Sequence, residues 1–203
     1  MITATFNLES QLWNSGKSFI CGVDEVGRGC FAGPVVAGAV IFPKNSPLIS
    51  GVADSKLLTP KKREELAVLI KEQALAWSVG EVSVEMINEV GIGKATQEAF
   101  RKAVANLKQA PDFILIDAFF IEGLEEEMQN AVKSGDRISA SIAAASIIAK
   151  VYRDKLMTEL DSQCPGYDLA VNKGYGTKSH RDALKKLGLS DLHRTSFDLQ
   201  KFL

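Results

Sequence analysis

The sequence has few cysteines and no spacing that would pair them or let them bind zinc. The three cysteines, Cys21, Cys30 and Cys164, are an odd number without a CxxC motif. Two of them lie among apolar residues. We therefore expect small buried thiols in a reducing cytoplasm, with no disulfides and no zinc ligands.

Long apolar runs and a basic leader are also missing. No stretch approaches the roughly 20 uncharged apolar residues that span a bilayer. Residues 1–19 contain no basic region followed by an apolar block. We expect no signal peptide, no membrane association and a cytoplasmic location.

Overall composition is that of an ordinary globular protein. The chain has 203 residues, 46% hydrophobic and 24% charged, with a formal net charge of −1. A chain of this size can form a full core, most simply in one domain covering residues 1–203. The charge balance argues against a polycation that coats nucleic acid, and a monomer is the default expectation.

Basic side chains are concentrated toward the C-terminus. Between residues 173 and 194 they are Lys173, Lys178, Arg181, Lys185, Lys186 and Arg194, with His180 and His193 among them. A solvated helix face would explain them, and so would a surface that holds phosphates. We expect an α/β core over about residues 18–160 and a basic, helical substrate-binding segment over about 165–203.

Strand-like and helix-like segments alternate along the chain. Apolar runs rich in Val, Ile and Phe predict strands at 18–23, 33–42 and 112–117, and residues 78–87 predict a short strand that runs toward a turn of helix. Apolar periodicity and capping residues predict helices at 59–77, 93–110, 137–163 and 178–188. Thr59 is the expected N-cap of the first helix, and Pro60 fits its first position. The alternation predicts an α/β fold with a sheet between helices.

Two of the predicted strands end in an aspartate. FICGVD ends at Asp24 and DFILID ends at Asp117. Ligands of α/β sheets gather beyond the carboxyl ends of strands, so neighbouring strands would present the two carboxylates side by side. Glu25 follows Asp24 directly, and a bend at Gly27 and Gly29 would let both side chains reach one site.

A fourth acid and a possible supporting acid flank the longest predicted helix. Asp136 follows the turn in NAVKSG, where helix capping is the alternative role. Four converging acids could not all stay ionised without a cation, and an all-oxygen site suits Mg²⁺ or Mn²⁺. Asp154 has Lys150 one turn earlier, which favours an ion pair or a position behind the ligands.

The segment GVDEVGRG has the length of a P-loop but lacks its chemistry. Arg28 stands where the phosphate-binding Lys would be, and Gly29 where the Mg²⁺-binding hydroxyl would be. The two acids inside it would repel phosphate unless a metal intervened. The segment is not a Walker motif.

The ordered set of motifs resembles bacterial ribonuclease HII, of the type 2 ribonuclease H family. The matching segments run from about residue 20 to residue 197 and are GVDEVGRG, AGPVVAGAV, ADSKLLTPKKRE, FILID, VKSGD, SIAAASIIAKVYRD, KGYGTKSH and LHRTSF. Each segment is a weak signal alone. Their combination in this order is a strong one.

The resemblance implies a fold, an activity and a metal centre. The fold would be ribonuclease H-like, with a central mixed β-sheet flanked by helices. The four metal-binding acids would be Asp24, Glu25, Asp117 and Asp136, with two Mg²⁺ or Mn²⁺ ions when substrate is bound. The enzyme would hydrolyse the phosphodiester 5′ of a ribonucleotide in duplex DNA or in an RNA/DNA hybrid, leaving a 3′-hydroxyl and a 5′-phosphate. Its role would be ribonucleotide removal from DNA.

The resemblance also implies how substrate is recognised. Gly27, Arg28 and Gly29 would sense the 2′-hydroxyl of the target ribose, the atom that separates RNA from DNA. Tyr175 would stack on the neighbouring deoxyribose, with burial in the core as the alternative. Phosphate contacts are expected from Ser55, Lys56, Lys173, Lys178, Arg181, His193 and Arg194, each with a solvated surface charge as the alternative.

Two departures from the family pattern and two competing functions stay open. Asn172 stands where many relatives have His, and Ala118 where Gly is common. A related nuclease that cleaves only hybrids is one alternative function, and a catalytically inactive nucleic-acid-binding module is the other. The sequence identifies no clamp or polymerase partner.

Overall fold

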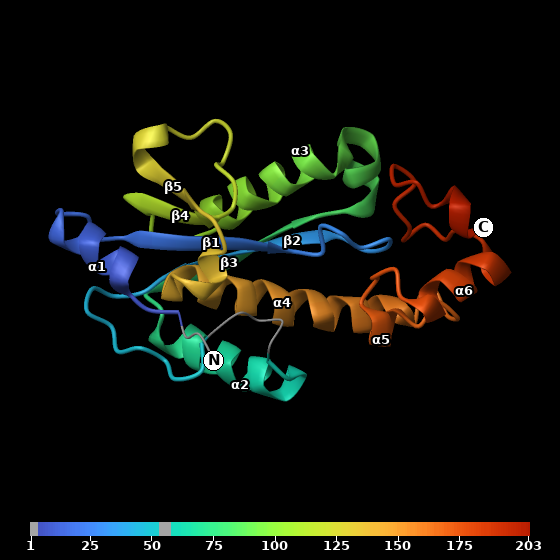
Figure 1. The fold of residues 1–203 in the computed structure, drawn as a ribbon, viewed down its shortest axis with the longest axis horizontal. Coiled ribbons are helices and arrows are strands. Elements are labelled where there is room, and N and C mark those ends of the chain that lie inside the picture. The colour runs from blue at the N-terminus through green and yellow to red at the C-terminus, as the bar shows by residue number, and fades with distance from the viewer. Residues whose placement is uncertain (1–3, 53–57) are drawn as a thin grey trace.

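The computed structural model describes residues 4–52 and 58–203, in which helices cover both faces of a five-stranded sheet (Figure 1). Along the chain the helices and strands are α1 (Asn7–Asn14), β1 (Ile20–Val26), β2 (Val35–Ile41), α2 (Pro60–Gln73), β3 (Ala76–Val82), α3 (Val84–Ala105), β4 (Phe113–Asp117), η2 (Glu126–Met128), β5 (Gln129–Val132), η3 (Gly135–Arg137), α4 (Ala140–Asp161), α5 (Leu169–Asn172), α6 (Lys178–Leu187) and η4 (Gln200–Phe202).

The sheet is mixed, as the family resemblance predicts. Its strand order is β3-β2-β1-β4-β5. The pairs β1–β2 and β2–β3 are antiparallel, whereas β1–β4 and β4–β5 are parallel. The central position of β1 explains why its sequence is an almost unbroken apolar run, because both faces of the strand are covered.

Helix α3 packs on one face of the sheet and α4 on the other, with α2 beyond α4 (Figure 1). Side chains such as Val23 and Phe100 fill the core on the α3 side, and Val40 and Ile147 fill it on the α4 side. A Cβ at Gly22 would overlap the backbone of α4, as would one at Gly38. The glycines of the strands and the small residues of α4 thus let helix and sheet approach closely.

The predicted start of α2 is confirmed, and its predicted end is wrong. The Thr59 hydroxyl accepts a hydrogen bond from the backbone N–H of Lys62, and Pro60 occupies the first turn. The helix ends at Gln73, not at residue 77, because the chain then joins the sheet: Leu75 N–H donates to the Ile41 carbonyl, and Trp77 lies in β3 opposite β2. Pairing of residues 76–82 with β2 thus outweighs the helical pattern of the local sequence.

The C-terminal segment lies beyond the end of α4, where α5, α6 and the tail surround a small core of their own (Figure 1). This core includes Ala32, Met157, Tyr167 and Leu184. The predicted helix at 178–188 is α6. The division of the chain near residues 160–165 stays a prediction.

The thiols and the helices can be described directly. Cys21, Cys30 and Cys164 are free thiols, the first two buried. Across the described ranges, none of the helices is both long and apolar enough to cross a membrane.

Candidate active site

Asp117, the last residue of β4, and Asp24, two residues before the end of β1, lie next to each other. Strands β1 and β4 are parallel neighbours, with Val23 paired to Ile116. The residues that follow, Asp24 and Asp117, therefore emerge at the same edge of the sheet. The condition for the two carboxylates to meet, that these strands are neighbours, is fulfilled, and the backbone alone brings them together.

Electrostatics at Asp24 are unfavourable for a negative charge. Burial raises the pKa of the Asp24 carboxyl well above its usual range, and repulsion from Glu25 and Asp117 raises it further. A hydrogen bond from the Ser146 hydroxyl and a 2.7 Å bond from the Glu25 backbone N–H oppose this increase in pKa. A buried acid with acidic neighbours is typical of a cation site.

Asp136 reaches the same edge through a short turn. It is buried in η3, and the preceding residue, Gly135, donates its backbone N–H to Asp117 Oδ1 at 2.7 Å. The N-cap of α4 is Ser139, whose hydroxyl accepts from Ile142 N–H. Capping of the long helix therefore does not explain Asp136.

The loop after β1 places an arginine beside the acids. One guanidinium nitrogen of Arg28 lies 4.0 Å from Glu25 Oε1, and the guanidinium stacks 4.4 Å from the centre of the Phe119 ring. Gly27 has a φ of +93°, and a Cβ there would overlap the Arg153 side chain. Gly29 is exposed, with no protein atom near the position of a Cβ. Only Gly27 is therefore required by the fold.

The metal centre is only partly assembled by the backbone. Within residues 4–52 and 58–203, no group of three or more His, Cys, Asp or Glu side chains is close enough to hold a metal ion. The convergence of all four acids thus stays a prediction. The donor chemistry nevertheless fits a hard divalent cation, because the candidate ligands are carboxylates and Asp24 is destabilised as a lone anion.

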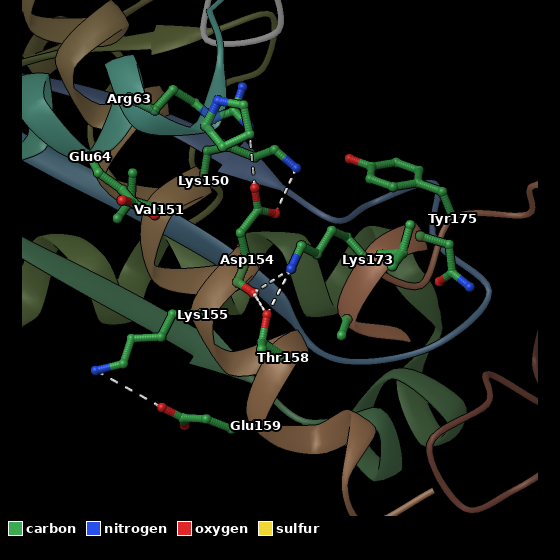
Figure 2. A pocket seen from close by; sticks show the side chains of 14 residues that line it. Arg63, Glu64, Lys150, Val151, Asp154, Lys155, Thr158, Glu159, Lys173 and Tyr175 are labelled. Carbon is green, nitrogen blue, oxygen red and sulfur yellow. Dashed lines mark hydrogen bonds and ion pairs between the residues drawn. The ribbon is translucent and has the colours of Figure 1, made fainter. Parts of the chain in front are cut away.

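Tyr175 forms part of a groove beside α4. The groove has a volume of about 930 Å³ and is lined by residues of α2, α4 and α5 with Lys173 and Tyr175. Tyr175 is 38% exposed, and its ring lies 5.5 Å from the Lys150 ammonium. Figure 2 shows the ring at one side of the groove and Arg63 and Asp154 across from it. Complete burial of Tyr175 in the core is therefore excluded.

Asp154 holds the basic side chains of the groove in place. Its carboxylate lies 2.7 Å from Lys150 Nζ and 3.5 Å from the Arg63 guanidinium (Figure 2). Lys173 Nζ donates to the backbone carbonyl of Asp154 and to the Thr158 hydroxyl. The predicted ion pair with Lys150 is confirmed. A phosphate contact by Lys173 stays a prediction.

The predicted phosphate contacts of His193 and Arg194 are wrong, because these side chains are 1% and 0% exposed. The Arg194 guanidinium donates to the backbone carbonyls of Arg28 and Gly33. Arg153, also fully buried, donates to the carbonyls of Pro34, Ala32 and Lys173. The two arginines hold the loop after β1 against the Lys173–Tyr175 loop.

Some site residues lie outside the described parts of the chain or were missed in the sequence. Ser55 and Lys56 lie outside the described residues. Ser146, which bonds to Asp24, was signalled only by a polar residue in the apolar stretch SIAAASII. Phe119, which stacks on Arg28, was signalled only by its closeness to Asp117 in sequence.

Comparison with known proteins agrees with this geometry. Residues 21–200 match the family model described as Ribonuclease HII. A curated Ribonuclease HII from Alkaliphilus oremlandii (strain OhILAs) is 50% identical over 205 residues, covering 98% of this chain and 99% of the relative.

Solved structures give the same assignment. The ribonuclease H2 of Pyrococcus horikoshii OT3 matches with a TM-score of 0.74 at 26% identity, covering 91% of this chain and 96% of that one. RNase HII from Archaeoglobus fulgidus, solved in a complex with PCNA, has a TM-score of 0.72 at 27% identity, covering 87% of this chain and 92% of that one. The chain therefore belongs to the ribonuclease HII family, metal-dependent endoribonucleases that cleave RNA in RNA/DNA hybrids.

Proposed function

We propose that this enzyme hydrolyses the phosphodiester on the 5′ side of a ribonucleotide embedded in duplex DNA or in an RNA/DNA hybrid, leaving a 3′-hydroxyl and a 5′-phosphate. Its role would be to remove ribonucleotides from DNA. One observation carries the proposal: the parallel pairing of β1 with β4 places Asp24 beside Asp117, and the Gly27–Gly29 loop follows where β1 ends at Val26. Recognition of a sugar and cleavage next to it would thus occur in one place.

Asp24, Glu25, Asp117 and Asp136 would hold two Mg²⁺ or Mn²⁺ ions. When bound, such ions supply Lewis acidity to the attacking water and to the leaving 3′-oxygen. The chain's own contribution is to hold carboxylates at a sheet edge where a lone anion is disfavoured, as the raised pKa of Asp24 indicates. Cation binding would relieve this cost, so the acids are suited to binding a cation and not to standing as solvated surface charges.

The loop after β1 would read the ribose. The exposed backbone at Gly29 has open space where a side chain would otherwise stand, so a sugar could approach it closely. The 2′-hydroxyl is the group that such an approach would detect. Arg28, held between Glu25 and the Phe119 ring, would contact the adjacent phosphate.

The groove beside α4 would accept the DNA side of the junction. Tyr175 stands at its edge as a platform for a deoxyribose, while Lys150 and Lys173 line the floor behind it. These contacts would position the backbone without reading base sequence. The buried Arg153 lies between the two recognition elements: its guanidinium is 6.0 Å from the centre of the Tyr175 ring, and its side chain fills the space beside Gly27. This contact supports a fixed separation between them.

Cleavage mapping tests the proposal. The substrate is one DNA duplex with one embedded ribonucleotide, labelled at its 5′ end, incubated with EDTA, Mg²⁺ or Mn²⁺. We expect a single cut on the 5′ side of the ribonucleotide that depends on the ion. A matched duplex without the ribonucleotide is the control and should remain intact.

Two outcomes would contradict it. Cleavage of a long RNA/DNA hybrid without any cleavage of the single-ribonucleotide duplex would favour the hybrid-only nuclease. Binding to both substrates without cleavage in either ion would favour an inactive binding module.

A further inference from the structure

The chain contains two histidines, and their rings are in direct contact. His180 lies in the first turn of α6, and His193 lies in the loop before Arg194. Their Nε2 atoms are 3.0 Å apart, and both side chains are buried. Both belong to the basic C-terminal segment, but neither is part of the metal centre or of the groove.

The outer nitrogen of each ring fixes where its proton lies. His193 Nδ1 lies 2.8 Å from the Ser190 hydroxyl, which can donate or accept, and 3.0 Å from the Ser190 backbone nitrogen, which can only donate. Because the backbone N–H points at it, His193 Nδ1 accepts and its proton is on Nε2. His180 Nδ1 lies 2.9 Å from the Tyr175 carbonyl, which can only accept, so His180 Nδ1 carries the proton. The inner bond therefore runs from His193 Nε2–H to His180 Nε2.

The result is one directed chain of hydrogen bonds that needs both rings neutral. An extra proton on His180 Nε2 would face the Nε2–H of His193. An extra proton on His193 Nδ1 would face the backbone N–H of Ser190. Burial lowers the pKa of both histidines, that of His193 to about 4.

Aromatic rings pack against the two histidines, and one further hydrogen bond holds the backbone of His193. The Tyr167 ring lies 4.7 Å from that of His193, and the Phe31 ring lies 5.9 Å from that of His180. Asn88 donates to the His193 carbonyl at 3.5 Å. Arg181, the nearby charged residue on α6, directs its guanidinium to the Gly176 carbonyl.

The chain of bonds ends on the backbone of the platform residue. At one end it holds the carbonyl of Tyr175. At the other end it reaches the Ser190 N–H, and His193 itself is followed directly in the chain by Arg194, which donates to the carbonyl of Arg28. The histidine pair thus links the Tyr175 loop to the sugar-sensing loop through the two rings, the backbone between His193 and Arg194, and the Arg194 guanidinium.

We propose that His180 and His193 are positioning residues for junction recognition: their directed hydrogen-bond chain sets the Tyr175 platform relative to the Gly27–Gly29 loop. The inference rests on the proposed function. The rings touch neither substrate nor metal ligands. The two histidines would contribute to the preference for an RNA-to-DNA junction over a long hybrid. Cleavage of a long hybrid does not depend on one stacked deoxyribose.

A matched pair of variants tests this role. His180→Phe keeps a ring but removes the donor to the Tyr175 carbonyl, whereas His180→Asn places an amide N–H near the Nδ1 position. We expect His180→Phe to lower the ratio of kcat/KM on the single-ribonucleotide duplex to that on a long hybrid roughly tenfold, because a buried hydrogen bond is lost. His180→Asn should largely restore the ratio. Equal losses on both substrates, no loss, or an Asn variant no better than Phe would overturn the proposal.

Nitrogen-15 NMR of the free wild-type protein gives a readout that needs no activity and no variant. Since the chain has two histidines, two ring spectra are expected, one with the proton on Nδ1 and one with the proton on Nε2, and both rings should titrate below the ordinary histidine pKa of about 6.5. Titration of either ring near pH 6.5, or the same tautomer in both, would overturn the proposal. A wild-type enzyme that fails on the single-ribonucleotide duplex would contradict the proposed function instead, and the NMR result would still decide whether the directed chain exists.

Discussion

The buried guanidinium of Arg194 donates a 2.9 Å hydrogen bond to the backbone carbonyl of Arg28, which lies 166 positions earlier in the chain. Two further bonds, of 3.0 and 2.8 Å, go to the carbonyl of Gly33. These bonds hold the loop after β1 against the buried guanidinium. Burial lowers the pKa of Arg194 to about 10, so the group stays charged at neutral pH. Arg194 is therefore part of the loop's support and is not part of the surface that would meet phosphate.

Arg194→Gln should destabilise the protein by about 2–4 kcal/mol, because loop carbonyls lose charged donors while remaining buried. Chemical denaturation measures the change in the free energy of unfolding. The matched control is Lys178→Gln at an exposed position of the same segment, with stability changed by less than about 0.5 kcal/mol. If Lys178 meets phosphate, only the control variant should flatten the salt dependence of substrate binding. A stable Arg194→Gln protein with a flattened salt response would restore the phosphate role.

The two glycines that flank Arg28 should respond differently to alanine. Gly27→Ala requires a positive φ and meets Arg153, so we expect a loss of about 2–4 kcal/mol in stability. Gly29→Ala has open space and should change stability by less than about 1 kcal/mol. If the backbone at Gly29 approaches the ribose, this variant should still lose cleavage of the single-ribonucleotide duplex. Full activity of a folded Gly29→Ala enzyme would show that the approach is not needed.

Asp24→Asn should exchange activity for stability. The pKa of Asp24 is higher in the folded protein than in the unfolded chain. Below the unfolded pKa of about 3.9 the neutral carboxyl costs the fold no stability, and the loss of stability grows as pH rises from there through the folded pKa. In EDTA, Asn at this position should therefore raise Tm, and the gain should grow from pH 4 to pH 8. Cleavage should fall at least about a hundredfold, since a metal ligand is lost.

The exposed Asp198, 75% accessible, gives the matched control, because Asp198→Asn should change neither activity nor the pH dependence of Tm. An Asp24→Asn protein that is less stable than wild type at pH 8 would mean that the carboxylate forms favourable contacts that outweigh its burial.

The sequence predicted those features that local chemistry determines. Asp24 and Asp117 were found because an acid at the end of an apolar strand is visible in one short segment. Thr59 was found because a cap followed by proline is a local signal. The pairing of β1 with β4 was the condition on which the shared site depended, and the structure supplies it.

Features that depend on distant contacts were not visible. Arg194 and His193 appeared to belong to an exposed basic face, because nothing in LHRTSF indicates that loop carbonyls from residues 28–33 surround the arginine. Leu69 belongs to the apolar pattern of the helix predicted at 59–77 but is 40% exposed in α2, because its neighbours Leu66 and Ile70 carry the buried face. The strand β5 was missed because its four residues carry little apolar pattern.

Ala118 occupies a position where glycine should be more stable. Its φ is +63°, in the left-handed region that favours glycine, directly after Asp117. Ala118→Gly should therefore stabilise the protein by about 1 kcal/mol, because the strain on Cβ is removed. Thermal unfolding measures the effect. Gly123→Ala, at an exposed loop position with a φ of +89°, is the converse control and should lose a similar amount. A drop in Tm for Ala118→Gly would mean that chain flexibility outweighs the strain.

Tyr175→Ala should weaken cleavage at junctions more than cleavage of long hybrids. The ring is partly exposed at the groove edge, and partial burial raises the pKa of its phenol to about 12, so the platform is neutral at working pH. Loss of stacking on one sugar should cost about tenfold in kcat/KM on the single-ribonucleotide duplex, by analogy with aromatic stacking on bases. A long hybrid offers other registers and should be affected much less. Tyr175→Phe keeps the ring and should resemble wild type on both substrates; equal losses on the two substrates for the alanine variant would exclude a stacking role and leave Tyr175 as a support for the fold.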